Sequence, residues 1–170
     1  MLYKLRVFLE TNGEDVYRDI EIQDNASLED LHNVIVNSFD FDGTEMASFY
    51  LTDEELNQGM EIPLFNIDES QPANNMMSNT LVKDVLSEER PNLLYVYDFL
   101  NMWRFLVGLM ETGEEAPGIE YPQVAYAQGI RPEDPPEIDF NNTEDDENDI
   151  FKDDENPFGE FYGYDENEWN

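Results

Sequence analysis

The sequence contains no cysteine and only one histidine, His32. Without cysteine the chain cannot form disulfides, hold a metal through thiolates or use a cysteine nucleophile. A transition-metal site would then depend almost entirely on carboxylates. We therefore expect no bound cofactor.

Phosphate-binding and nucleophile motifs are also missing from the 170 residues. There is no G-x-G-x-x-G or G-x-x-x-x-G-K-S/T loop to hold phosphates, and no G-x-S-x-G turn to present a serine. Carboxylates are so frequent that a chance pair carries no information about acid–base catalysis. The sequence thus shows no catalytic constellation.

Basic residues are few. The chain has 8 lysines and arginines against 41 aspartates and glutamates, which gives a formal charge of −33. Nucleic-acid phosphates and anionic membranes repel such a polyanion, because binding to nucleic acid depends on basic side chains that displace counterions. A basic protein, a cationic surface or a metal ion suits the charge better. We expect a protein partner, with a basic one favoured, and no direct contact with nucleic acid or membrane.

Long apolar runs are absent too. The N-terminal segment MLYKLRVFLE carries Lys4 and Arg6 inside its apolar stretch, so it lacks the h-region of a signal peptide. No segment approaches the length of a transmembrane helix, and a cytoplasmic location is the resulting expectation. Because 40% of the residues are hydrophobic and 13% are aromatic, the chain can still form a folded core.

Hydrophobic patterning predicts two strands, a helix and a third strand at the start of the chain. Residues 2–10 and 16–23 alternate with the period of half-buried strands, and an Asn-Gly pair between them favours a hairpin turn. Arg18 interrupts the apolar face of the second strand, which indicates a place near a sheet edge. Ser27 can cap the helix, and residues 46–52 form the third strand. This ββαβ order is typical of a β-grasp-like start.

The middle of the chain predicts a second short helix and a central hairpin. A polar loop with one short strand near 60–65 precedes a helix over 81–87. The richest apolar runs, 93–99 and 103–111, predict an antiparallel pair at the centre of the sheet. The expected fold class is therefore α+β, with a mixed or antiparallel sheet.

Composition divides the chain into three parts. Residues 1–112 form the predicted α+β domain. Residues 113–136 are rich in proline, which should prevent regular structure over most of the segment, and we expect them to pack on the domain. Residues 137–170 are an irregular acidic tail that also contains seven aromatic residues.

Three interpretations of the tail remain open. Its aromatic side chains can pack back on the domain while the carboxylates face water, because soluble proteins seldom expose large apolar patches. The tail can instead become ordered on a basic, hydrophobic partner. The third interpretation is a calcium site at Asp145, Glu147 and Asp149, although Ile150 stands where an EF-hand loop has glycine.

Five residues are candidates for a ligand-binding or structural cluster: His32, Asp98, Asn101, Trp103 and Arg104. Asp98 follows a strongly apolar strand, and Arg104, just across the predicted turn, is its natural ion-pair partner. His32 lies on the flank of the buried face of the first helix. For the histidine and for the ion pair, packing is favoured over a functional role.

The same turn carries a family resemblance. Tyr97-Asp98-Phe99 followed by Trp103 resembles the Tyr-Asp-Phe-Gly-Asp-x-Trp motif of the plasmid pRiA4b ORF-3-like proteins, which are also known as passenger proteins of the IS1096 insertion element. Tyr121-Pro122 and Pro132-Glu133-Asp134 resemble a Tyr-Pro and Pro-Glu-Asp stretch of that family. The resemblance extends over residues 1–136 and implies an α+β fold.

This chain departs from the family pattern at polar positions. Leu100-Asn101 replaces the Gly-Asp of the motif, Phe105 replaces a histidine after the tryptophan, and the family's cysteines are missing. The metal or acid–base chemistry of those residues does not transfer to this chain. Since the family has no settled activity, the resemblance implies a fold without a mechanism.

The leading functional hypothesis is a non-enzymatic protein-interaction domain whose acidic tail engages a basic partner or covers the domain. The alternative is an enzyme or small-ligand binder with a site near Asp98, Trp103 and Arg104, which requires a pocket that contains these side chains. A third hypothesis, a DNA-mimicking acidic protein, rests on charge alone.

Overall fold

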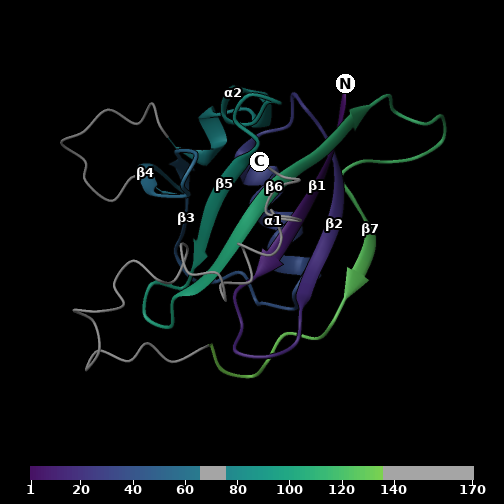
Figure 1. Ribbon diagram of the computed structural model, residues 1–170. Coiled ribbons are helices and arrows are strands. Elements are labelled where there is room, and N and C mark those ends of the chain that lie inside the picture. Colours follow the sequence, from purple (N-terminus) through teal and green to yellow (C-terminus); the bar gives the residue numbers. More distant parts are fainter. Residues whose placement is uncertain (66–75, 136–170) are drawn as a thin grey trace.

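A seven-stranded antiparallel sheet forms the centre of the protein (Figure 1). The computed structural model describes residues 1–65 and 76–135. The strands are β1 (Leu2–Leu9), β2 (Val16–Gln23), β3 (Ala47–Thr52), β4 (Gln58–Pro63), β5 (Asn92–Tyr97), β6 (Trp103–Gly113) and β7 (Gln123–Gln128). They lie in the order β4-β3-β5-β6-β1-β2-β7, and each pairing is antiparallel. The sequence left a mixed or an antiparallel sheet open, and the described strands form an antiparallel one.

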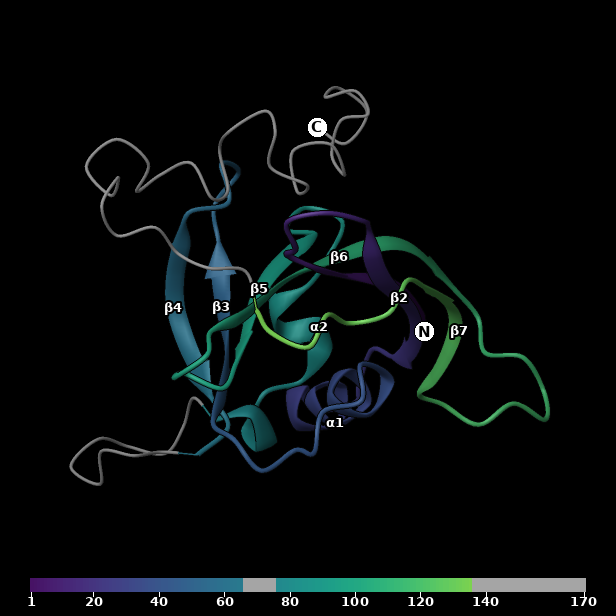
Figure 2. The same cartoon turned by 90° about the horizontal axis from the view of Figure 1, so that it is seen from below.

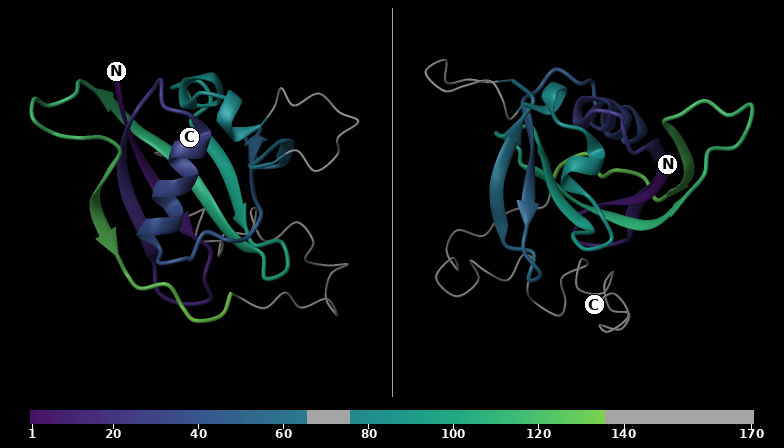
Figure 3. Two further views of the ribbon diagram at one scale, coloured as in Figure 1. Left: turned by 180° about the vertical axis from the view of Figure 1, so that it is seen from behind. Right: turned by 90° about the horizontal axis from the view of Figure 1, so that it is seen from above.

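Two helices, α1 (Leu28–Ser38) and α2 (Val82–Val85), lie on one side of the sheet (Figures 2 and 3), and a 3₁₀ turn spans Met77–Asn79. Leu28, Leu31 and Ile35 of α1 have no exposed surface and belong to the same core as Leu5 and Val7 of β1. The expected α+β class is therefore confirmed. Among the described residues, no helix is long and apolar enough to cross a membrane.

The element order β1-β2-α1-β3 matches the predicted ββαβ start, and the predicted central hairpin is present as β5 and β6. However, β5 and β6 separate β3 from β1 in the sheet. The β-grasp comparison thus stays a prediction.

Ser27 begins α1 as the sequence predicts. Asp30 N donates to Ser27 Oγ at 3.0 Å, and Ser27 N donates to Asp30 Oδ2 at 3.3 Å. This reciprocal capping box satisfies two backbone donors that would otherwise lack partners at the first turn.

Replacing Ser27 with alanine is expected to lower the free energy of unfolding by about 1 kcal/mol, because the change removes the acceptor for Asp30 N and leaves the apolar face of α1 intact. Urea unfolding followed by circular dichroism measures the loss. Ser38→Ala is the matched control, since the Ser38 hydroxyl donates to Ile35 O within the helix and caps nothing at the first turn. Equal losses in the two variants would contradict the prediction.

The proline-rich segment contains a strand, β7, where the sequence predicted irregular structure. β7 pairs with β2 at the edge of the sheet. Residues 123–128 themselves lack proline and glycine, and an edge strand needs a partner on one side only. Gly129 follows with φ of 80°, and a Cβ there would meet Asp15 O at 2.5 Å. Glycine is therefore required where the chain leaves β7.

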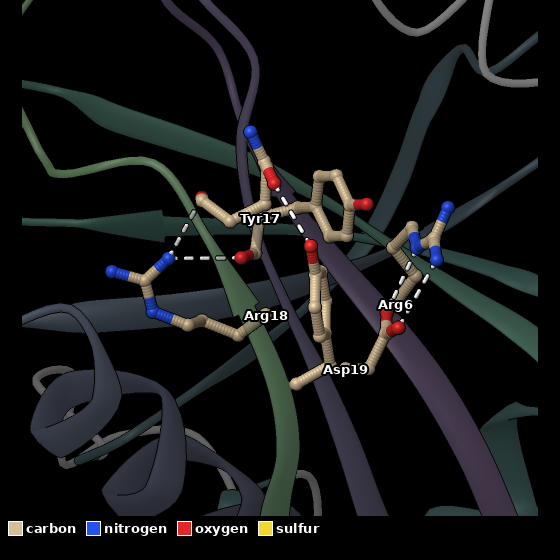
Figure 4. A network of polar contacts seen from close by, with 6 residues as sticks. Arg6, Tyr17, Arg18 and Asp19 are labelled. Carbon is tan, nitrogen blue, oxygen red and sulfur yellow. Dashed lines mark hydrogen bonds and ion pairs between the residues drawn. The ribbon is translucent and has the colours of Figure 1, made fainter.

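Arg18 is buried and does not lie at a sheet edge, because β7 covers the outer side of β2. Its guanidinium donates to three backbone carbonyls, those of Tyr17 (2.8 Å), Ser38 (2.9 Å) and Gln128 (3.0 Å), two of which are drawn in Figure 4. The charged group also lies 4.6 Å from the centroid of the Phe39 ring. These contacts satisfy the buried donors and tie β7 to the end of α1.

Candidate functional site

A pocket of about 310 Å³ lies at the end of the sheet where β5 turns into β6. The turn itself, the loop that follows α1, and the segment that follows β7 all contribute to its lining. Three parts of the chain that are distant in sequence therefore form one site.

Asp98 holds the β5–β6 turn in place. Its backbone has φ of 67°, a left-handed conformation that aspartate adopts more readily than most residues. Its Oδ1 accepts hydrogen bonds from Leu100 N (3.1 Å) and Asn101 N (3.3 Å), and its Oδ2 accepts one from Asn101 Nδ2 (2.6 Å). The carboxylate is thus bound within its own turn. The predicted ion pair with Arg104 is wrong: it is not among the ion pairs of the described residues.

Tyr97 connects this turn to the loop after α1. Its hydroxyl donates to Asp42 Oδ1 at 3.1 Å and accepts hydrogen bonds from Gly43 N (3.0 Å) and Glu45 N (3.4 Å). Burial raises the pKa of Tyr97, so the hydroxyl stays protonated and keeps its donor role at neutral pH. The Tyr97 hydroxyl therefore holds the loop after α1 against the β5–β6 turn at one side of the pocket.

The floor of the pocket is aromatic. Trp103 is 4% exposed and meets Phe41 edge-on, with ring centroids 5.2 Å apart. The guanidinium of Arg131 lies 4.3 Å from the centroid of Phe41 and 5.2 Å from that of Trp103. Arg131 Nε donates to Phe39 O at 2.7 Å, and its Nη2 donates to Asp40 O at 3.0 Å. Within the described part of the chain it makes no ion pair, so carbonyls and aromatic faces hold it.

Carboxylates outnumber bases around this floor. Six of them line the pocket: Asp40, Asp42, Glu45, Asp98, Glu133 and Asp134. Arg131 is the one basic residue among the described lining residues. Hydrogen bonds from Thr44, and then from Tyr97, lower the pKa of Asp42, which keeps that carboxylate charged. Negative charge beside aromatic rings is the environment that attracts cations.

The β5–β6 turn of the pocket carries the family motif noted in the sequence, Tyr97-Asp98-Phe99 followed by Trp103. The profile of the plasmid pRiA4b ORF-3-like proteins matches residues 1–157. The chain belongs to this family. Among solved structures, a crystal structure of a protein of unknown function, MM3350 from Methanosarcina mazei Go1, is similar with a TM-score of 0.64 and 23% identity. The similarity covers 78% of this chain and 73% of that one, and it concerns the fold. No match to a curated protein was found.

In this pRiA4b ORF-3-like protein, three of the five predicted cluster residues come together: Asp98, Asn101 and Trp103 line the pocket. His32 does not, because its Nδ1 lies 2.7 Å from Tyr95 Oη inside the core, where burial lowers its pKa to about 4. Arg104 does not either. It follows Trp103 along β6, and successive side chains of a strand point to opposite faces.

The sequence reasoning missed the pocket residues outside the turn, in particular Asp42, Glu45 and Arg131. Arg131 directly precedes the Pro132-Glu133-Asp134 stretch that carried part of the family resemblance. This position next to a family motif was the sequence signal that could have identified Arg131 as a site residue. Nothing comparable marks Asp42 and Glu45 among so many other acidic residues.

The calcium candidate at Asp145, Glu147 and Asp149, like the whole 137–170 tail, lies outside the described residues. Within the described ranges, no group of three or more histidine, aspartate or glutamate side chains has the arrangement of a metal site.

Proposed function

We propose that this protein is a non-enzymatic binding module that takes a cationic side chain of a basic protein partner into the pocket beside Trp103. The observation that carries the proposal is the charge of the lining, with six carboxylates and one arginine over an aromatic floor. An incoming ammonium or guanidinium group gains from the carboxylates, which accept its hydrogen bonds, while the faces of Phe41 and Trp103 already hold Arg131.

Arg131 supports this choice of ligand, since the chain already places one guanidinium over Phe41 and Trp103. Its donors use backbone carbonyls, and the exposed carboxylates of Glu45 and Glu133 stay outside the ion pairs of the described residues. Those carboxylates remain for a second cation that enters from solvent.

The charge of the whole chain supports a basic partner as well. A formal charge of −33 speeds the encounter with a cationic protein and makes it sensitive to ionic strength. The acidic residues of the 137–170 segment add to this attraction.

Glu45→Gln combined with Glu133→Gln is expected to weaken the binding of a lysine- and arginine-rich peptide by about tenfold, as two partly screened ion pairs would. Isothermal titration calorimetry on the full chain at low and moderate salt measures the change. Glu14→Gln combined with Glu88→Gln is the matched control, because it removes two exposed carboxylates elsewhere and gives the same net charge. Equal weakening by both double variants would show that the peptide senses total charge alone, and the pocket proposal would then be wrong.

A second candidate, a small-ligand binder or enzyme, uses the same pocket. It is favoured by the fact that Asp98, Asn101 and Trp103 meet in a hollow, as that hypothesis requires. Titration with free arginine and with a linear polyamine separates the two. Binding of these small cations as tightly as the peptide would favour the small-ligand function, because a protein partner gains from contacts beyond the pocket.

A further inference from the structure

The loop between β1 and β2 contains the one Asn-Gly pair of the sequence, Asn12-Gly13. Such a pair is typical of a tight hairpin turn, in which both residues adopt positive φ. In the structure, β1 and β2 pair only as far as Leu9 and Val16, and residues 10–15 join them as a longer loop. Neither Asn12 nor Gly13 is among the described residues with positive φ. The pair therefore does not serve the turn conformation that usually selects it.

The loop leaves this pair open to solvent and weakly held. Asn12 and Gly13 are both exposed, and a Cβ added at Gly13 would meet no atom within 4 Å. Gly13 N makes one long hydrogen bond, to Thr11 Oγ1 at 3.4 Å. The Asn12 side chain has no hydrogen bond within the described parts of the chain. No described contact thus keeps the Asn12 carboxamide away from the backbone nitrogen that follows it.

We propose that Asn12 is a site of spontaneous deamidation in which the backbone nitrogen of Gly13 is the nucleophile. Gly13 N gives its proton to water and forms a bond to Cγ of Asn12. The Cγ–Nδ2 bond breaks, and the side-chain nitrogen takes a proton from water and leaves as ammonia. Water then opens the cyclic imide at either carbonyl, which leaves aspartate or isoaspartate at position 12. Water is the sole co-reactant, and no group is oxidised or reduced.

Glycine favours this reaction because of its conformational freedom. The attack requires Gly13 N to approach Asn12 Cγ within bonding distance, and a side chain on the second residue restricts the backbone conformations that allow this. An exposed loop also samples these conformations without first breaking a ladder of hydrogen bonds. Asn12-Gly13 meets both conditions.

Asn37 provides an internal comparison. It is exposed like Asn12, and the small residue Ser38 follows it. However, it lies in α1, and the helical hydrogen bonds continue past it, since Phe39 N donates to Ile35 O at 3.1 Å. The nitrogen of Ser38 must leave the helix before it can attack, because an α-helix bonds each such nitrogen to a carbonyl one turn earlier. The open backbone, in addition to exposure, therefore distinguishes Asn12.

The product changes both the charge and the backbone of the loop. Deamidation adds one negative charge near Glu14 and Asp15, and isoaspartate also inserts a methylene group into the main chain. The base of the loop is fixed, because Asp15 O lies so close to Gly129 that a Cβ there would be 2.5 Å away. The exposed tip must therefore take up the added length, and the sheet should stay intact. None of these residues lines the pocket, so this proposal and the proposed function can fail independently.

The test incubates the full chain at neutral pH and follows each asparagine by peptide mass spectrometry. Asn12 is expected to deamidate faster than Asn37 by about tenfold or more, because local opening of the helix must precede reaction at Asn37. Isoaspartate and aspartate should both form at position 12. In urea-unfolded protein the reaction at Asn37 should accelerate, whereas the rate at Asn12 should change little.

Gly13→Ala is the variant that tests the nucleophile. It is expected to slow deamidation of Asn12 and to leave the fold intact, since its Cβ meets no neighbour and Gly13 lacks positive φ. Asn37 in the same variant should react at the wild-type rate.

Three results would overturn the proposal. Equal rates at Asn12 and Asn37 in the folded protein would show that the loop does not promote the reaction. Strong acceleration of Asn12 by urea would show that the folded loop protects it. Aspartate without isoaspartate, or a rate at Asn12 that Gly13→Ala leaves unchanged, would mean that water hydrolyses the side chain directly and that Gly13 N takes no part.

Discussion

Trp103→Ala is expected to lower the free energy of unfolding by about 3–5 kcal/mol, the usual cost of removing a buried indole. Trp103 is almost fully buried and lies against Phe41 at the pocket floor. The substitution also removes one of the two rings over which Arg131 lies. Arg131 then loses part of its support, and with it the segment that places Glu133 at the pocket, so peptide binding should weaken in protein that is still folded. Denaturant unfolding and calorimetry at low temperature measure the two effects separately.

Phe99→Ala is the control for this prediction. Phe99 belongs to the same turn and to the same family motif, but it is 37% exposed. Its truncation should change the free energy of unfolding by about 0.5–1 kcal/mol. If Trp103→Ala cost no more than Phe99→Ala, the tryptophan of the motif would not be the anchor of the turn.

Glu10→Gln is expected to stabilise the protein at pH 7.5 by about 3 kcal/mol. Burial raises the folded-state pKa of Glu10 from 4.5 to about 7. Between these two values the folded carboxyl keeps a proton that the unfolded one has lost, so the free energy of unfolding of the wild type falls as pH rises. Glutamine cannot ionise, so the variant does not lose free energy of unfolding in this way as pH rises. Urea unfolding at pH 5 and pH 7.5 measures it, with Glu14→Gln, an exposed residue of the adjacent turn, as control.

His32 makes the free energy of unfolding rise with pH, opposite to Glu10, over a pH range that overlaps with that of Glu10. Burial lowers its folded-state pKa from 6.5 to about 4, so the unfolded state binds a proton that the folded state does not. Its contribution to stability is complete above pH 6.5 and is lost as pH falls toward 4. In the wild type the two effects offset each other between about pH 4.5 and 6.5. Glu10→Gln should therefore reveal a rise in stability with pH over this window, and parallel pH profiles for variant and wild type would refute the assignment.

Local patterns were sufficient to predict most of the fold. The alternation in β1 and β2, the Ser27 cap and the apolar β5–β6 hairpin all rest on neighbours in sequence. β7 was missed because Val124 and Tyr126 are 42% and 52% exposed, so the strand has no buried face that would show as a hydrophobic period. Arg18 was misplaced for the same reason, since a strand missing from the prediction made β2 look like an edge.

The candidate site was predictable only where its residues are close in the chain. Asp98, Asn101 and Trp103 share one turn, whereas Asp42 and Arg131 reach the pocket through tertiary contacts that composition does not reveal. Sequence proximity also misled, because it grouped Arg104 with Trp103 although the strand places them on opposite faces. The ion pair of Asp98 was wrong because backbone donors of its own turn bind the carboxylate.

The position of β1 between β2 and β6 has a consequence for synthesis of the chain. Its second neighbour spans Trp103–Gly113, so Leu2 pairs with a residue more than a hundred positions later. At ribosomal speeds of about 5–20 residues per second, β1 waits on the order of 5–20 s for that partner. Such non-local pairing also slows folding after release. During this interval the nascent hairpin presents two unpaired edges, because β2 also waits for β7. This is the stage at which a chaperone would protect the chain.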